Sequence, residues 1–131
     1  MYGGEAKHDR GFDEFHGFLA GAHPYWIKPG RSKIIHNREP DQTAEGHATE
    51  LFTLWAEKFI RQNAAKDAPF FCYLSYNAVH GPLRTDKSKP ASAPEAWVKK
   101  ALDRGVSFLR SDYVAILEHM DHNIGKLVNV L

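Results

Sequence analysis

The stretch that decides the fold reads Pro69-Phe70-Phe71-Cys72-Tyr73-Leu74-Ser75-Tyr76, followed by Asn77-Ala78-Val79-His80-Gly81-Pro82. Its first eight residues begin with a proline, are apolar on both faces and are rich in aromatic side chains. This pattern is typical of a β-strand that is buried on both faces of a parallel sheet. The remaining six residues contain a Gly-Pro break, which indicates a loop. The sequence therefore predicts one buried strand near residues 70–76, with a loop at its carboxyl end.

His80 lies in that loop and is the candidate catalytic residue. In open α/β sheets, ligands bind beyond the carboxyl ends of the strands. A free imidazole gains and loses a proton close to physiological pH, so a histidine here could serve as a general acid or contact a developing oxyanion. From position alone, an ordinary loop histidine without a catalytic role stays an open alternative.

Helical patterns flank the predicted strand. Before it, two rows of apolar residues repeat at i, i+4 spacing, which predicts a helix near residues 50–63. The rows are Leu51, Trp55 and Phe59, and Phe52, Ala56 and Ile60. Thr49 is the expected N-cap of this helix. After the strand, a short helix is expected near residues 94–102 and a long helix near residues 111–131. The helix-strand-loop-helix order over residues 49–131 predicts an α/β fold.

Residues 1–48 are rich in glycine, histidine, proline and aromatic residues and show no sustained period. They are expected to form long loops, with one short helix near residues 13–19 on which Phe12, Phe15 and Phe18 pack along one side. Long structureless stretches are uncommon in a self-contained small domain. This region therefore indicates either a functional loop region or a piece whose packing partner is absent.

Composition narrows the function classes. The chain has 131 residues, is 43% hydrophobic and carries a net charge of +1, with its basic residues scattered. The absence of a basic stripe argues against a nucleic-acid partner. The apolar runs are too short to span a bilayer, so no membrane partner is expected. The first residues show no charged region followed by an apolar one, so no signal peptide is expected.

Cys72 is the single cysteine, which excludes an internal disulfide. A reactive thiol needs partial exposure and an electropositive setting. Between Phe71 and Tyr73 in the predicted strand, Cys72 is instead expected to be a small buried apolar side chain.

His119 and His122, with Asp121 between them, raise the alternative of a metal site. Two histidines at i, i+3 can share a helix face, and zinc accepts imidazole ligands. No third ligand recurs at a matching spacing, and the neighbouring Glu118 and Lys126 are typical of a solvated face. We therefore expect no metal ligand in this pair.

Four stretches of the chain resemble the sulfatase family, within the alkaline-phosphatase-like superfamily of hydrolases. RGFDEFHGFL at residues 10–19 resembles the family's RGFDEFxGF segment, and GHATELFT at residues 46–53 is similar to GYLTDLFT. PFFCYLSYNAVHGPL at residues 69–83 resembles PFFLYLSYNAVHTPL, with Gly81 in place of the usual threonine. Residues 113–125 resemble the helix that precedes the family's next strand.

The resemblance implies that residues 1–131 are an incomplete internal segment of a sulfatase catalytic domain, part of an α/β/α sandwich. His80 matches the family histidine that contacts the sulfate and protonates the leaving oxygen. The family's nucleophile is a formylglycine made within a C/S-x-P/A-x-R motif, which Cys72 and its neighbours do not match. The family's calcium-binding aspartates, the Lys and His of its GKWHLG segment and its Asp-Asn-Gly ligands also have no counterparts.

These departures predict that calcium and formylglycine belong to the full-length parent and that no residue of this chain binds either. The chain alone is expected to be inactive, because such catalytic groups act as a unit. Its expected partners are a sulfate-ester substrate, possibly a carbohydrate, and the missing flanking segments of the same domain. The resemblance implies a secreted, periplasmic or lysosomal parent. A phosphoryl or phosphonate ester hydrolase of the same superfamily, or a non-enzymatic binding module, stays an alternative.

Overall fold

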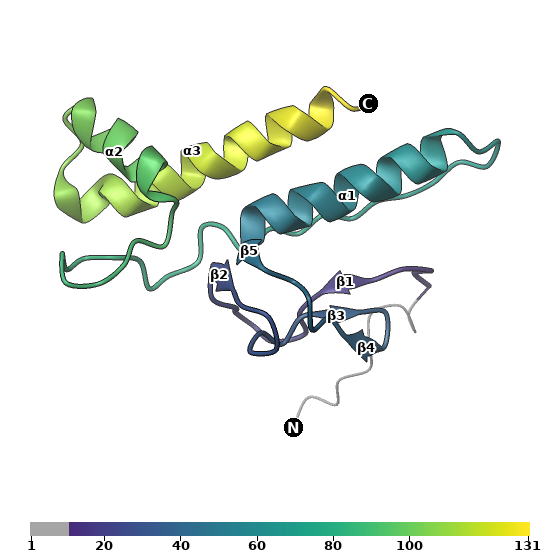
Figure 1. The fold of residues 1–131 in the computed structure, drawn as a ribbon. Coiled ribbons are helices and arrows are strands. Elements are labelled where there is room, and N and C mark those ends of the chain that lie inside the picture. The colour runs from purple at the N-terminus through teal and green to yellow at the C-terminus, as the bar shows by residue number, and fades with distance from the viewer. Residues whose placement is uncertain (1–10) are drawn as a thin grey trace.

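The computed structural model describes residues 11–131, which form three helices and a set of two-residue strands. The helices are α1 (Ala48–Ala64), α2 (Glu95–Asp103) and α3 (Phe108–Val128). The strands are β1 (His16–Gly17), β2 (Trp26–Ile27), β3 (Ile35–His36), β4 (Glu39–Pro40) and β5 (Gly46–His47). α3 packs against both α1 and α2, and the strands lie on the other side of α1 from α3 (Figure 1).

The long helices confirm the predicted helical patterns, but their ends differ from the prediction. α1 begins at Ala48, and its N-cap is His47, which has an extended backbone and whose ring Nδ1 accepts the Thr49 N–H at 3.3 Å. Thr49 is instead buried inside the first turn, where its carbonyl accepts the Thr53 hydroxyl at 2.7 Å. A neutral histidine ring has one nitrogen that can accept a hydrogen bond, so His47 takes the capping role that was expected of Thr49. α2 and α3 begin at Glu95 and Phe108, within a few residues of the expected positions.

The N-terminal region forms antiparallel pairs in place of the predicted short helix. β1, β3 and β4 make one antiparallel sheet in the order β1-β3-β4, while β2 pairs with β5. Asn37 connects β3 to β4 with a positive φ of 56°, and its side chain and backbone both bond Phe15. Because these bonds satisfy the backbone of Phe15 across the chain, the local helix does not form. The part of the loop prediction that falls on residues 1–10 lies outside the described residues.

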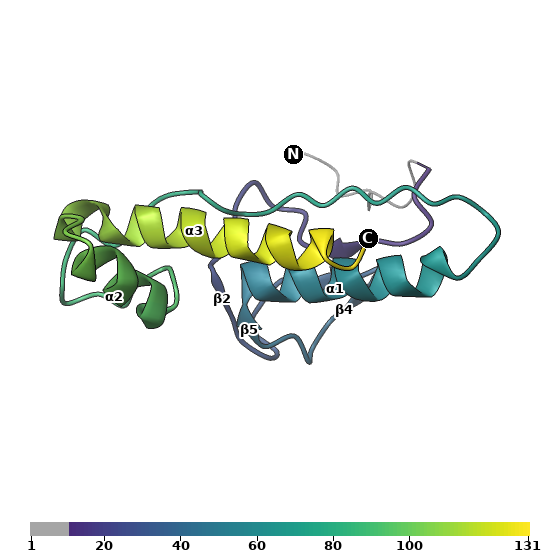
Figure 2. The same cartoon turned by 90° about the horizontal axis from the view of Figure 1, so that it is seen from above.

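The predicted buried strand is not a strand in this structure. Residues 69–77 run as an extended segment beside α1 (Figure 2), and no partner strand pairs with them within residues 11–131. Alternate side chains face α1: the Phe70 ring meets Phe59 at 5.6 Å, Leu74 packs in the core, and the Tyr76 hydroxyl bonds Thr53 at 2.8 Å.

The other face of this segment is open to solvent. Phe71 and Tyr73 lie on this face and are 73% and 63% exposed. Cys72, which was expected to be buried, is also exposed. The two-period alternation is that of a strand, but burial on both faces needs a second layer, and ladder bonds need neighbouring strands. Neither is supplied by the described part of the chain, so the segment has strand-like alternation without strand pairing.

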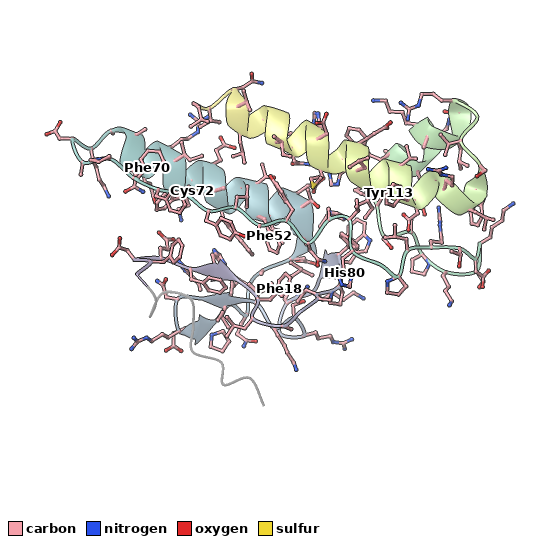
Figure 3. All side chains as sticks on the ribbon, turned by 180° about the vertical axis from the view of Figure 1, so that it is seen from behind. Phe18, Phe52, Phe70, Cys72, His80 and Tyr113 are labelled. Atoms are coloured by element: carbon pink, nitrogen blue, oxygen red, sulfur yellow. The ribbon has the colours of Figure 1, made fainter. Side chains whose placement is uncertain are left out.

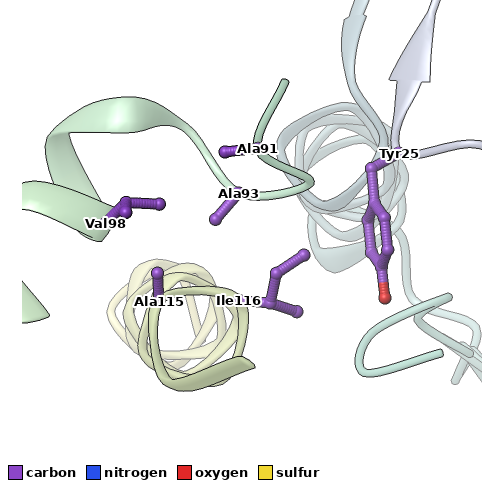
Figure 4. Close-up of a cluster of buried hydrophobic side chains, with 6 residues drawn as sticks. All are labelled: Tyr25, Ala91, Ala93, Val98, Ala115 and Ile116. Atoms are coloured by element: carbon purple, nitrogen blue, oxygen red, sulfur yellow. The ribbon is translucent and has the colours of Figure 1, made fainter. Parts of the chain in front are cut away.

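The core lies in three clusters along the helices. One joins α2 and α3 to the N-terminal loops, and its buried members are Tyr25, Ala91, Ala93, Val98, Ala115 and Ile116 (Figure 4). The second joins α1 to the short strands, and the third joins α1 to the end of α3. No helix in the described part of the chain is long and apolar enough to cross a membrane.

Asp112, near the start of α3, holds the loop between the extended segment and α2. Its buried carboxylate accepts the backbone N–H groups of Arg84 at 2.8 Å, Ser92 at 3.0 Å and Ala93 at 2.9 Å. Burial alone would raise the pKa of Asp112, but these hydrogen bonds outweigh it and lower the pKa. The carboxylate therefore stays charged at neutral pH and fixes the path of residues 84–93, which follow His80.

Candidate functional site

His80 lies in a turn at the end of the extended segment, as the sequence predicts for the loop. Its backbone N–H donates to the carbonyl of Asn77 at 3.0 Å, closing the turn. The side chain is exposed (Figure 3), and its Nδ1 bonds the carbonyl of Gly81. Because a carbonyl can only accept, Nδ1 carries the proton, and Nε2 is the ring nitrogen left facing the surroundings.

A tyrosine distant in sequence holds the backbone of His80. The Tyr25 hydroxyl accepts the His80 N–H at 2.7 Å and donates to the His80 carbonyl at 3.0 Å, with the carbonyl of Asn77 also within reach at 3.3 Å. Tyr25 is only 7% exposed, and burial raises the pKa of its hydroxyl. The hydroxyl therefore stays neutral and can donate and accept at the same time.

A second connection ties the same turn to the same loop. The Asn77 side-chain amide donates to the carbonyl of His23, two residues before Tyr25. The loop is itself anchored, since the carbonyl of Tyr25 accepts the N–H of Ala48 at the start of α1, at 2.7 Å. Hydrogen bonds thus fix His80 to the N-terminal region and, through it, to α1.

Two hollows meet at His80. One, of about 400 Å³, lies between the extended segment, α1 and residues 12–21. The other, of about 410 Å³, is bordered by residues 22–26, 80–82 and 90–92. Ligand sites are concave and carry a few fixed polar groups, and the exposed ring of His80 stands on the rim of both hollows. The position is suited to proton transfer to or from a bound group.

Apart from His80, the histidine and glutamate side chains beside the first hollow already have partners. The His16 Nε2 lies 2.9 Å from Asp41, and Glu14 lies 3.1 Å from the Nε2 of His36. Cys72 borders this hollow, and although its side chain is exposed, partial desolvation of the sulfur raises the thiol pKa, which disfavours the reactive thiolate. Among these groups His80 has the ring nitrogen that is free to act.

The pair His119 and His122 does not converge on a common point. His119 is buried between α1 and α3, where its Nε2 bonds Glu50 at 3.0 Å and its ring meets the edge of His47 at 4.7 Å. His122 is exposed and contacts the ring of Trp97. The expectation that this face is solvated was therefore wrong for His119. Within residues 11–131, no three His, Cys, Asp or Glu side chains are grouped to hold a metal ion.

Sequence reasoning missed four polar residues that shape the site: Tyr25, Asn77, His47 and Asp112. Their long-range partners lie between 19 and 55 residues away, so no local pattern points to them. The available signals were weak. Asn77 directly follows the strand predicted at residues 70–76, and His47 directly precedes α1, which carries the apolar rows.

Comparisons with known proteins give the chain a family. The family model described as Sulfatase matches residues 2–131. The chain is 31% identical over 123 residues to the uncharacterized sulfatase YdeN of Escherichia coli (strain K12), covering 94% of this chain and 20% of that protein. It is 27% identical over 90 residues to N-acetylgalactosamine-6-sulfatase of Rattus norvegicus, covering 69% of this chain and 14% of that protein.

The fold is also similar to a solved structure. The crystal structure of Ps i-CgsB in complex with k-i-k-neocarrahexaose superposes with a TM-score of 0.79 at 26% identity, covering 96% of this chain and 30% of that chain. The chain spans about a fifth or less of the length of the two curated relatives named above. With a family model over nearly its whole length and a matching α/β, alkaline-phosphatase-like structure, the chain belongs to the sulfatase family.

Proposed function

We propose that this chain is an internal segment of a sulfatase catalytic domain and that it contributes His80 as an active-site histidine. The proposal rests on the hydrogen bonds that hold the backbone of this residue and on the exposure of its ring. The backbone of His80 is held by Tyr25 and by the Asn77 turn, while its ring stands exposed where two hollows meet. A fixed backbone with a free ring nitrogen is the arrangement that a positioned acid requires.

In this role His80 contacts the sulfate and gives a proton to the leaving oxygen. Its Nδ1 is engaged by the carbonyl of Gly81, so the proton must travel through Nε2. The neutral ring has no proton on Nε2, and therefore the acting form is the imidazolium. Proton transfer by a positioned side chain contributes about 10²- to 10⁴-fold to a reaction rate. The ring alone does not supply a nucleophile.

The residues of this chain do not fit the calcium and formylglycine that the family implies. No described cluster of acidic and histidine side chains could hold a cation, and Cys72 lies outside the modification motif with its thiol pKa raised. We propose that both groups belong to flanking segments of the parent, which complete the site.

We propose sulfate esters of carbohydrates as the substrate class. Two relatives support it by name: an N-acetylgalactosamine-6-sulfatase and a protein crystallised with a neocarrahexaose. The phosphoryl-ester alternative predicts preference for a phosphate ester, and the binding-module alternative predicts no turnover by any longer form of the protein.

The test uses the parent catalytic domain that contains this segment. His80→Ala should lower kcat toward a carbohydrate sulfate ester, whose leaving alkoxide needs a proton, by about 10²- to 10⁴-fold. His122→Ala removes an exposed histidine remote from the hollows and is the matched control, expected to retain activity. Equal activity of the two variants would remove His80 from the mechanism. Faster hydrolysis of 4-nitrophenyl phosphate than of 4-nitrophenyl sulfate by the unmodified domain would favour the phosphoryl alternative.

The isolated 131-residue chain gives the complementary measurement. Because it lacks the family's nucleophile motif, it should hydrolyse 4-nitrophenyl sulfate no faster than buffer, with or without added calcium. Substantial hydrolysis that disappears in His80→Ala would show that the chain holds a complete site, contrary to the proposal.

A further inference from the structure

The ring of His80 has little to hold it in place on its own. The side chain is exposed, and the hydrogen bond that fixes its ring runs from Nδ1 to the carbonyl of the next residue. The direction of the ring is therefore set by the backbone of residues 80 and 81. Whatever fixes that backbone determines where Nε2 points.

The Tyr25 hydroxyl fixes that backbone from both sides of one residue. It accepts the N–H of His80 at 2.7 Å and donates to its carbonyl at 3.0 Å. A hydroxyl that engages both backbone groups of one residue restrains rotation of its peptide planes. The restraint is stiff because the Tyr25 ring is buried in the cluster with Ala91, Ala93 and Ile116 (Figure 4).

We propose that Tyr25 is a positioning residue for His80, acting through the backbone to aim Nε2 at the leaving oxygen. The inference rests on the proposed function of His80 as the proton donor. Tyr25 itself touches no reacting atom. Its contribution follows from the steep dependence of proton transfer on geometry, since a displacement of about 1 Å can cost about 10²-fold in rate.

The hydroxyl can be separated from the packing of the ring. Tyr25→Phe keeps the aromatic ring in its cluster and removes one oxygen atom. Tyr76→Phe is the matched control, because the Tyr76 hydroxyl is also partly buried and its hydrogen bond, of 2.8 Å, is to Thr53 and not to the His80 backbone. Each variant loses one tyrosine hydroxyl: Tyr25→Phe loses the hydrogen bonds to the His80 backbone, and Tyr76→Phe loses the one to Thr53. Thermal unfolding of each variant reports its own structural cost.

The kinetic readout uses two substrates of the parent catalytic domain. 4-Nitrophenyl sulfate has a good leaving group that needs little protonation, whereas a sugar sulfate leaves as a poor alkoxide that needs it strongly. Tyr25→Phe should lower kcat for the sugar sulfate by about tenfold or more, within the range that a general acid contributes. The loss for 4-nitrophenyl sulfate should be several-fold smaller, with KM little changed, because protonation is a transition-state event.

The His80→Ala background completes the experiment. In that background, Tyr25→Phe should cause no further loss of kcat, because the imidazole that Tyr25 positions is gone. A purely structural role of Tyr25 would instead lower kcat equally in the unmodified and the His80→Ala backgrounds. Tyr76→Phe should leave the ratio of the two substrates' kcat values unchanged. Equal losses for both substrates in Tyr25→Phe, or losses that add to those of His80→Ala, would overturn the inference. If His80→Ala itself has no effect, the proposed function fails instead, so the two failures are distinguishable.

Discussion

The open face of the extended segment predicts that the isolated chain associates. Phe71 and Tyr73 project from it with 73% and 63% of their surfaces exposed, and residues 70–76 make no ladder hydrogen bonds within the described part of the chain. Unpaired strand edges template pairing with another chain. Replacing both side chains by lysine adds charge to the open face beside the unpaired backbone and removes apolar surface from it. The double variant Phe71→Lys with Tyr73→Lys should therefore favour the monomer.

The size of the effect follows from the exposed fractions. Full burial of a large apolar side chain is worth about 1.5–3 kcal/mol, and roughly two thirds of each side chain is still available for burial. The two residues together then offer about 2–4 kcal/mol per chain. At 1.4 kcal/mol for each factor of ten, their loss should weaken association by about 30- to 700-fold.

Size-exclusion chromatography and sedimentation at a series of concentrations would measure this shift. Leu54→Lys with Leu131→Lys is the matched control, because these residues are 56% and 84% exposed and the same charge is added away from the segment. The control should associate like the unmodified chain. A sharp monomer peak for the unmodified chain, with one cooperative unfolding transition above about 50 °C, would refute the reasoning.

Two further predictions concern stability, measured by urea unfolding in the Phe71→Lys, Tyr73→Lys background. Asp112→Asn keeps one acceptor oxygen and should lower the free energy of unfolding by about 1–3 kcal/mol, because the N–H groups of Arg84 and Ala93 bond different oxygens of Asp112 and cannot both be satisfied. Asp112→Ala removes both acceptors and should cost more. Equal losses in the two variants would contradict this account. Burial and then the nearby His119 lower the pKa of His47 to about 4. The unfolded state therefore binds more protons between about pH 6.5 and 4, so stability should fall by up to about 1.4 kcal/mol per unit as the pH drops through that window, and His47→Gln should flatten the slope.

The sequence alone determined the features that depend on neighbouring residues. The i, i+4 rows predict α1 because one helix face must be apolar to be buried, and this face meets the strands and the extended segment. The strand-like alternation of residues 70–76 and the placement of His80 in the following loop also follow from local pattern. The four matched stretches were enough to indicate the family, since their spacing along the chain is part of the signal.

The tertiary structure decided what depends on partners distant in the chain. Residues 70–76 have the composition of a doubly buried strand, yet the segment is covered on one face, because burial and pairing are properties of the neighbours and not of the segment. The same reason hides the support of the site from the sequence. Tyr25 meets His80 across 55 residues, and His119 meets Glu50 across 69. A buried polar group must find its partner wherever the fold brings one, and only the folded chain shows which residue that is.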